Sequence, residues 1–192
     1  DFAIAYINLG SVLINLRRLD EAEMCTRESI KLDPSIDIAY SNLAQILKDQ
    51  GNLDEAEKYA LKSIEINPEF ALGHSILGNI LKDLGKYIYA EKSYQKAIYL
   101  KPRVGDFHGN LASLLRDIGQ PNDAEKSIRT AIELSPNSPI LFNCLGLIMR
   151  DLGNLFEAEI CFRKSMALDS SSVYPLCNLA VLKNSLNDKE LQ

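Results

Sequence analysis

The sequence of 192 residues lacks the features that define several large protein classes. It has no run of about 18 apolar residues, so we expect no membrane-spanning helix. It has no Pro, Ser or Gly tract long enough to act as a linker. Its 26 acidic residues outnumber its 21 lysines and arginines, which argues against a nucleic-acid partner because phosphates favour a basic surface.

Cysteine and histidine are scarce, and neither forms a metal-binding pattern. The cysteines are Cys25, Cys144, Cys161 and Cys177, and none belongs to a C-x-x-C pair. We interpret them as reduced and mostly buried residues, which predicts a reducing, cytoplasmic location. His74 and His108 share a position with large aromatic residues of other repeats, which favours core packing over metal binding.

Motifs of catalysis and cofactor binding are also missing. There is no Gly-rich phosphate loop, H-E-x-x-H, G-x-S-x-G or dinucleotide-binding fingerprint. The abundant carboxylates fall on the outer faces of expected helices, where charged residues are common. We therefore predict a protein without enzymatic activity, cofactor or metal.

The sequence does contain a repeat with a period of 34 residues. One column, a set of positions 34 residues apart, is always leucine: Leu9, Leu43, Leu77, Leu111, Leu145 and Leu179. The residue after each leucine is small: Gly10, Ala44, Gly78, Ala112, Gly146 and Ala180. Another column is alanine followed by glutamate: Ala22, Ala56, Ala90, Ala124 and Ala158. Four repeats close with a proline: Pro34, Pro68, Pro102 and Pro136.

Each repeat has the pattern of two helices. In the second repeat, Leu43 and Leu47 lie one turn apart on an apolar face, and Gly51 ends that helix by adopting a left-handed conformation. The second helix is expected from about Asp54 to Ile66, where Pro68 stops it. A connection of about three residues requires the two helices to pack antiparallel.

The predicted architecture is an all-α, right-handed superhelical solenoid that occupies residues 1–192 as a single domain. One hairpin is too small to bury a core alone, so neighbouring hairpins must complete it. We expect repeats at about 3–36, 37–70, 71–104, 105–138 and 139–172, then a single helix over 173–187. Because the sequence begins with Asp1 and stops in mid-pattern, we expect a fragment of a longer chain.

These columns resemble the tetratricopeptide repeat, whose signature includes an aromatic residue, Leu-Gly, a central Ala and a terminal Pro. The third repeat carries the pattern as His74, Leu77, Gly78, Ala90 and Pro102. The Asn-Leu-Ala/Gly tripeptides are loosely similar to those of O-GlcNAc transferases and of bacterial tetratricopeptide proteins. Departures are the absence of Trp, Arg17 in place of a turn glycine, and Pro121 in the turn before a second helix. The resemblance implies a binding module in which the first helices line a concave groove.

Two columns of the first helices are expected to face such a groove. Their candidate peptide-binding residues are Asn8, Asn42, Gln45, Asn79, Asn110, Leu147 and Asn178. An amide both donates to and accepts from a peptide backbone, so a row of amides can hold an extended chain of any sequence. The alternative is that these amides only hydrate the groove or bridge neighbouring helices.

The far end of the expected groove is apolar, with Cys144, Leu147, Cys177 and Val181. An exposed apolar patch is usually buried by a partner, and the candidates are a bound segment, a second copy or a further part of the chain. The alternative is that the last helix simply frays or caps the array.

Four first helices end with a basic residue followed by an aspartate. These pairs are Lys48-Asp49, Lys82-Asp83, Arg116-Asp117 and Arg150-Asp151. Aspartate near a helix C-terminus is disfavoured by about 0.3–1 kcal/mol, so each needs a partner. We predict a lateral ladder that joins Asp49 to Lys82, Asp83 to Arg116, and Asp117 to Arg150. The alternative is an acidic stripe that receives a basic ligand.

The leading hypothesis is a scaffold that binds a protein or an extended peptide on its concave face, without a nucleic-acid or membrane partner. The alternative is a substrate-recruiting accessory region of a larger enzyme, of glycosyltransferase or sulfotransferase type, whose catalytic domain lies outside this sequence. A third hypothesis is self-association through the apolar C-terminal end.

Overall fold

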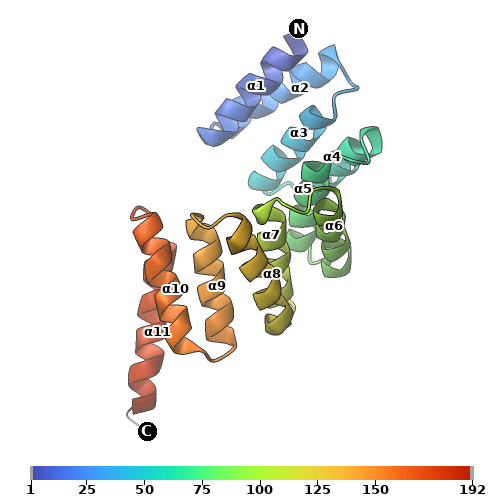
Figure 1. Cartoon of the computed structure of the whole chain (residues 1–192). Coiled ribbons are helices and arrows are strands. Elements are labelled where there is room, and N and C mark those ends of the chain that lie inside the picture. Colours follow the sequence, from blue (N-terminus) through green and yellow to red (C-terminus); the bar gives the residue numbers. More distant parts are fainter. Residues whose placement is uncertain (1, 191–192) are drawn as a thin grey trace. The chain divides into compact units, whose positions relative to one another are not determined.

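The structure, a computed structural model, describes residues 2–190 and their side chains up to residue 183. Every secondary-structure element in this described part is an α-helix (Figure 1). The first helices of the repeats are α1 (Phe2–Asn15), α3 (Asp37–Asp49), α5 (Ala71–Asp83), α7 (Gly105–Asp117), α9 (Pro139–Asp151) and α11 (Tyr174–Glu190). The second helices are α2 (Leu19–Leu32), α4 (Leu53–Ile66), α6 (Tyr87–Leu100), α8 (Pro121–Leu134) and α10 (Leu155–Leu168). The predicted all-α array of helix pairs, with five and a half repeats, is confirmed.

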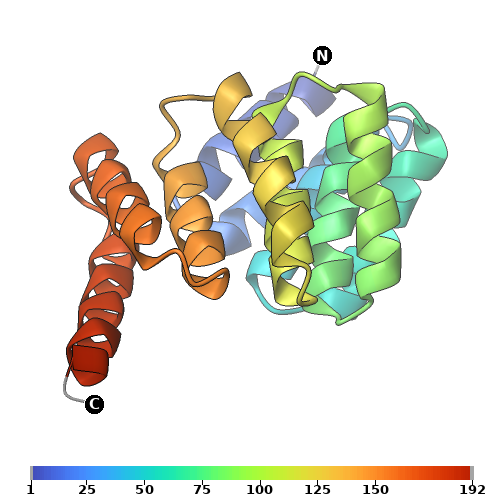
Figure 2. The same cartoon turned by 60° about the horizontal axis from the view of Figure 1, so that its bottom comes forward.

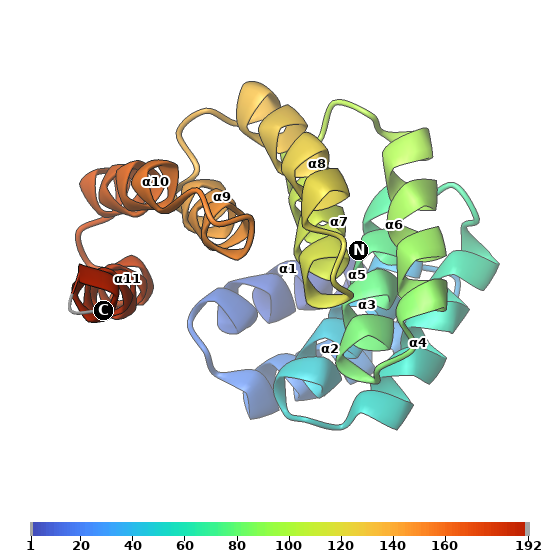
Figure 3. The same ribbon diagram turned by 90° about the horizontal axis from the view of Figure 1, so that it is seen from below.

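The chain divides into two compact units, residues 1–102 and residues 103–192. The N-terminal unit holds three hairpins, α1–α2, α3–α4 and α5–α6, and each of α2 and α4 also packs on the first helix that follows it (Figure 3). The C-terminal unit holds the hairpins α7–α8 and α9–α10, and α11 packs on both α9 and α10 (Figure 2). The proposal of a single domain over residues 1–192 stays a prediction.

The turn inside each hairpin depends on one residue with a positive φ. In the second repeat, Gly51 has φ 86°, its N–H donates to the Lys48 carbonyl, and the Asn52 N–H donates to the Leu47 carbonyl over 2.8 Å. This pair of bonds satisfies carbonyl groups that the helix end leaves open. Gly85, Gly119 and Gly153 repeat the conformation, as the sequence predicted.

Proline at the start of a second helix does not disturb the fourth repeat. Pro121 is the first residue of α8 rather than a turn residue that precedes it. At this position the N–H that proline lacks has no partner within the helix, and the fixed φ of proline suits the helix.

The small-residue column is matched by a second column on the facing helix of the same hairpin. A Cβ added to Gly78 would lie 2.5 Å from the Tyr94 ring, and one added to Gly146 would lie 2.5 Å from the Phe162 ring. Where the small residue is Ala44, the facing helix carries Ala60 in the column of these rings. In the hairpins of Gly78 and Gly146, glycine provides the space that a buried ring needs, whereas Gly10 of the first hairpin faces Thr26.

The leucine column forms part of the core, with Leu9 as an exception. Leu43, Leu77, Leu145 and Leu179 are buried, whereas Leu9 of α1 is 48% exposed. The helices that carry the four buried leucines, α3, α5, α9 and α11, each pack on a preceding hairpin of their unit. The exposure of Leu9 indicates that burial at this column requires such a neighbour, since one hairpin alone does not cover it.

Candidate binding face of the first helices

The first helices lie side by side within each unit. In the N-terminal unit α3 contacts both α1 and α5, and in the C-terminal unit α9 contacts both α7 and α11. Positions spaced by four, seven and eleven residues share one side of a helix. On α3 these are Ile38, Asn42, Gln45 and Asp49. We call this side of the first helices, taken in each unit by itself, the first-helix face.

The amides of the first-helix face contact their neighbours in the array. Asn42 Nδ2 donates to Ser11 Oγ over 3.1 Å, which joins α3 to α1. Asn178 Nδ2 donates to Asn143 Oδ1 over 2.9 Å, which joins α11 to α9. Each of these bonds uses one of the two N–H groups of a side chain that also has an acceptor oxygen. Two of the amides therefore bridge neighbouring helices, which was the alternative considered from the sequence. Peptide binding by the same amides stays a prediction.

The other predicted amides have different surroundings. Asn79 Oδ1 accepts a hydrogen bond from the Tyr94 hydroxyl of its own hairpin over 2.8 Å. Gln45 Nε2 donates to Asp49 Oδ1 one turn further along α3. Asn8 is exposed on α1, and Asn110 is half-buried on α7.

A row of apolar side chains on the first-helix face was not singled out from the sequence. In the N-terminal unit it consists of Ile4, Ile38 and Leu72, which are 43–52% exposed. In the C-terminal unit it consists of Ile140 and Tyr174, which are about three-quarters exposed. The residues recur every 34 positions, with Asp106 as the exception. The signal for this row in the sequence is the recurrence of apolar residues, at the period of the repeat, at positions outside the expected core.

In the C-terminal unit this apolar row borders a pocket of about 270 Å³ among α9, α10 and the start of α11. The lining residues are Pro139, Ile140, Asn143, Ser165, Asp169, Ser172 and Tyr174. Ser165 Oγ donates to the Pro139 carbonyl over 2.8 Å, which holds α10 against the start of α9. Hydrogen bonds from the Ser171 hydroxyl and backbone lower the pKa of Asp169, so its carboxylate stays charged beside the pocket.

The apolar end predicted for the array is partly buried. Leu147 and Cys144 are half-buried and pack on the core of the C-terminal unit. Val181 of α11 is exposed, as are Leu176 and Cys177. Self-association through this surface stays a prediction.

The charged ladder runs in the direction opposite to the prediction. Lys48 Nζ lies 3.3 Å from Asp83 of the following hairpin, and Asp49 lies 3.4 Å from Arg17 of the preceding one. The predicted partner of Asp49 was Lys82. Successive side chains of a helix point about 100° apart, so the basic residue faces the following repeat and the aspartate faces the preceding one.

The C-terminal unit has the same direction of pairing. Arg116 Nε lies 3.8 Å from Asp151 of the following hairpin and also pairs with its neighbour Asp117. Arg150, the predicted partner of Asp117, pairs with Asp151 beside it at 3.0 Å. The predicted pair of Asp83 with Arg116 joins the two units and stays a prediction.

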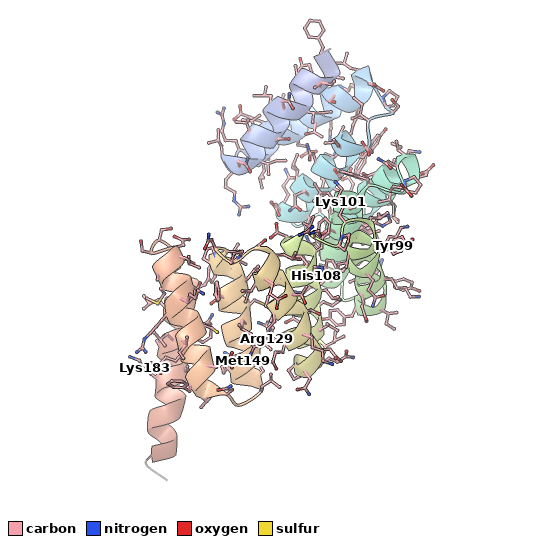
Figure 4. All side chains as sticks on the ribbon, in the orientation of Figure 1. Tyr99, Lys101, His108, Arg129, Met149 and Lys183 are labelled. Atoms are coloured by element: carbon pink, nitrogen blue, oxygen red, sulfur yellow. The ribbon has the colours of Figure 1, made fainter. Side chains whose placement is uncertain are left out.

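Carboxylates on the outer faces of the second helices also join neighbouring hairpins, a role that their position in the sequence did not predict. Arg129 of α8 (Figure 4) lies 2.8 Å from Glu157 of α10, and the hydrogen bonds that it donates to Glu157 and Glu125 raise its pKa. In the N-terminal unit Arg27 of α2 contacts Glu55 and the Tyr59 hydroxyl of α4. These contacts join successive second helices within each unit.

The cysteine and histidine side chains differ in their burial and contacts. Cys161 is buried, and burial raises its pKa to about 11, so the thiol stays protonated. Cys177 is exposed, which differs from the expectation that the cysteines are mostly buried. His74 Nε2 lies 2.9 Å from the Pro68 carbonyl oxygen. Within the described residues, no group of three or more His, Cys, Asp or Glu side chains is placed to hold a metal ion.

Comparison with known families gives the same repeat over most of the chain. One model described as tetratricopeptide repeat matches residues 35–104. A second model with that description matches residues 3–36 and 105–138. No curated protein sequence matches the chain. Along the part of the chain that the structure describes, no helix combines the length and apolar character needed to cross a membrane.

Several solved structures are similar to this one. A thermophilic TPR protein of Thermus thermophilus, TTC0263, has a TM-score of 0.84 at 19% identity, over 94% of this chain and 98% of its own. PilF of Pseudomonas aeruginosa has a TM-score of 0.82 at 18% identity, over 98% and 86%. YrrB, described as a TPR protein with an unusual peptide-binding site, has a TM-score of 0.63 at 21% identity, over 91% and 90%. At these identities the similarity concerns the fold.

Proposed function

Because the chain belongs to the tetratricopeptide repeat family, we propose that it is a protein-binding scaffold that holds an extended polypeptide segment along the first-helix face of its N-terminal unit. Proteins built from this repeat are generally non-catalytic scaffolds for protein interaction. The observation that carries the proposal is the row of exposed apolar side chains Ile4, Ile38 and Leu72 beside the amides Asn8 and Asn42. Apolar groups in a repeated line on one face favour a partner that covers them.

The spacing of the row limits the conformation of the bound segment. Packed neighbouring helices are about 8–10 Å apart. A polyproline II segment has three residues per turn and rises about 3.1 Å per residue, so every third side chain returns to the same side after about 9 Å. We therefore propose a ligand with apolar side chains at every third residue, which contact Ile4, Ile38 and Leu72 in turn.

The amides supply contacts to the backbone of that segment. Asn42 already donates one N–H to Ser11, which fixes the orientation of its side chain. Its second N–H and its carbonyl oxygen suit a backbone carbonyl and a backbone N–H of the ligand. Each neutral hydrogen bond contributes about 0.5–1.5 kcal/mol, and covering each apolar side chain contributes on the order of 1–2 kcal/mol. Because association has its own entropic cost, the affinity is expected to be modest.

The experiment is a selection from a display library of short random peptides on the immobilised wild-type chain. We expect enrichment of peptides that carry apolar residues at every third position. The variant Ile38→Ser/Leu72→Ser is expected to lose most of this binding, because it removes two of the three apolar contacts of the N-terminal unit.

The matched control is Met24→Ser/Leu61→Ser, which removes two exposed apolar side chains from the second helices α2 and α4. It is expected to bind the selected peptides as the wild type does. Circular dichroism on all three proteins verifies that they are equally folded. Equal peptide binding by wild type and the Ile38→Ser/Leu72→Ser variant would remove the first-helix face from the mechanism.

A further inference from the structure

Helix α6 differs from the other second helices in its charge. In α2, α4 and α8 acidic residues outnumber basic ones, and α10 has equal numbers. In α6 the basic residues Lys92 and Lys96 outnumber the single acidic residue Glu91. Lys101 follows the helix at its C-terminal end, and Lys86 before its N-terminal end pairs with Glu57 of α4. In a chain with net charge −5, α6 is therefore a local basic segment.

The difference arises at three positions of the repeat. Where α4 has Asp54, Glu55 and Glu65, α6 has Ile88, Tyr89 and Tyr99. These three side chains are 71%, 63% and 78% exposed. Ile88, Lys92, Gln95 and Tyr99 share one side of the helix, with Tyr89 and Lys96 at its margin. We call these six residues the α6 outer face.

The lysines of this face contact the rings of tyrosines on the same helix, whereas the cations of α8 contact carboxylates of their own helix. Lys164 of α10, at the position of Lys96, also lies over a ring, that of Phe142. Lys92 Nζ lies 6.0 Å from the centre of the Tyr89 ring, and Lys96 Nζ lies 5.2 Å from the centre of the Tyr99 ring. Tyr99 and Lys101 lie at the C-terminal end of the helix (Figure 4). On α8, by contrast, Lys126 pairs with Asp123 and Arg129 with Glu125.

An exposed cation over a ring gains only a small interaction energy. The ammonium group also has three N–H donors, and a ring contact leaves donors available for a ligand. A carboxylate brought by a partner would form a charge-assisted hydrogen bond with the same lysine. Tyrosine offers a large and rigid contact surface, and it is enriched at protein interfaces. The face thus offers positive charge and apolar area together.

We propose that the α6 outer face is a second docking site, separate from the first-helix face, for an acidic protein segment that carries aromatic or aliphatic side chains between its carboxylates. The carboxylates pair with Lys92 and Lys96, and the apolar side chains cover Ile88 and the two tyrosine rings. A short acidic segment contacts this face alone, whereas a long polyanion such as nucleic acid would extend onto the acidic helices α2 and α4 and be repelled there.

The test uses a short synthetic peptide in which aspartate alternates with phenylalanine and leucine. Its binding to the full chain is followed by amide chemical shifts in NMR spectra. We expect saturable shifts concentrated in α6, which weaken as salt is added because the contacts are partly ionic. A peptide with asparagine in place of every aspartate is expected to bind at least about tenfold more weakly.

The informative variant is Ile88→Asp/Tyr89→Glu, which restores the acidic pair that α2 and α4 carry at these positions. It should fold normally and lose at least about tenfold in affinity for the acidic peptide. The control is Gln120→Glu/Asn122→Asp, which adds the same charge at exposed positions at the start of α8. It should bind as the wild type does.

Four results would overturn the proposal: no binding of the acidic peptide, equal binding of the asparagine peptide, unchanged affinity in the Ile88→Asp/Tyr89→Glu variant, or equal losses in both variants. Oligothymidylate and vesicles that contain phosphatidylserine are titrated in parallel. If either shifts the α6 resonances more strongly than the peptide does, the site binds a polyanion or a membrane surface instead of a protein. A variant that loses binding at the first-helix face should still bind the acidic peptide at α6, so the two proposals fail separately.

Discussion

At the residue scale, the first hairpin differs from the four that follow in the residue that adopts the positive φ of its turn. The turn positions Gly51, Gly85, Gly119 and Gly153 have φ between 72° and 86°. Arg17 occupies the same position with φ 59°. An L-residue in this left-handed conformation costs roughly 1–2 kcal/mol, because its Cβ approaches the backbone carbonyl. The first turn therefore stores strain that the other turns do not have.

Replacing Arg17 with glycine should relieve that strain. Because the substitution also removes the exposed contact of Arg17 with Asp49 at 3.4 Å, its effect is measured against Arg17→Ala, which loses the same contact but keeps Cβ. We expect Arg17→Gly to be more stable than Arg17→Ala by about 1 kcal/mol in urea unfolding. Equal unfolding midpoints for the two variants would show that the turn is unstrained.

At the element scale, the two helices of a hairpin approach each other through paired columns of side chains. Gly146 of α9 faces the ring of Phe162 of α10, and Phe162 is fully buried. A ring enclosed in this way has no space to move aside. The distance between the helices is thus set by the combination of a missing side chain on one and a large ring on the other.

Gly146→Ala should therefore be destabilising by about 1–3 kcal/mol, because the new methyl group would lie 2.5 Å from the Phe162 ring. The substitution Phe162→Leu in the same chain should recover part of this loss by removing ring atoms. We expect a coupling energy of at least about 1 kcal/mol in a double-mutant cycle measured by urea unfolding. Additive effects of the two substitutions would mean that the two residues do not limit helix approach.

At the scale of the whole molecule, the chain consists of two compact units with a boundary after residue 102. In the N-terminal unit, α2 packs on α3 and α4 packs on α5, so each hairpin completes the core of the next. In such arrays stability is approximately the sum of hairpin and nearest-neighbour terms. A part of the chain that retains its internal interfaces should then retain its fold.

A fragment of residues 1–102 should accordingly be helical and should unfold cooperatively in urea. Its transition is expected at a lower urea concentration than that of the full chain, with a smaller slope because less surface becomes exposed. A fragment of residues 1–86 serves as the control, because it lacks α6 and leaves the buried face of α5 without Tyr94. The fragment of residues 1–86 should unfold in urea without a cooperative transition. A 1–102 fragment without helical circular dichroism would contradict the division into these units.

The sequence by itself determined the helices and their pairing. The second helix expected over Asp54 to Ile66 is α4 (Leu53–Ile66), and the first helix of that repeat ends before Gly51 as expected. The last helix, expected over residues 173–187, is α11 (Tyr174–Glu190). These features are local, since they depend on the helical period, on glycine at a positive φ and on proline after a helix end.

Only the tertiary structure decided how side chains of different hairpins meet. Lys48 and Asp49 are adjacent in sequence, yet one reaches forward to Asp83 and the other back to Arg17, and Asn42 bonds to Ser11 of the preceding helix. Neighbouring residues on a helix point about 100° apart, and the rotation between stacked hairpins determines which of them faces which neighbour. That rotation arises from packing across the interface, so the local pattern of one repeat does not contain it.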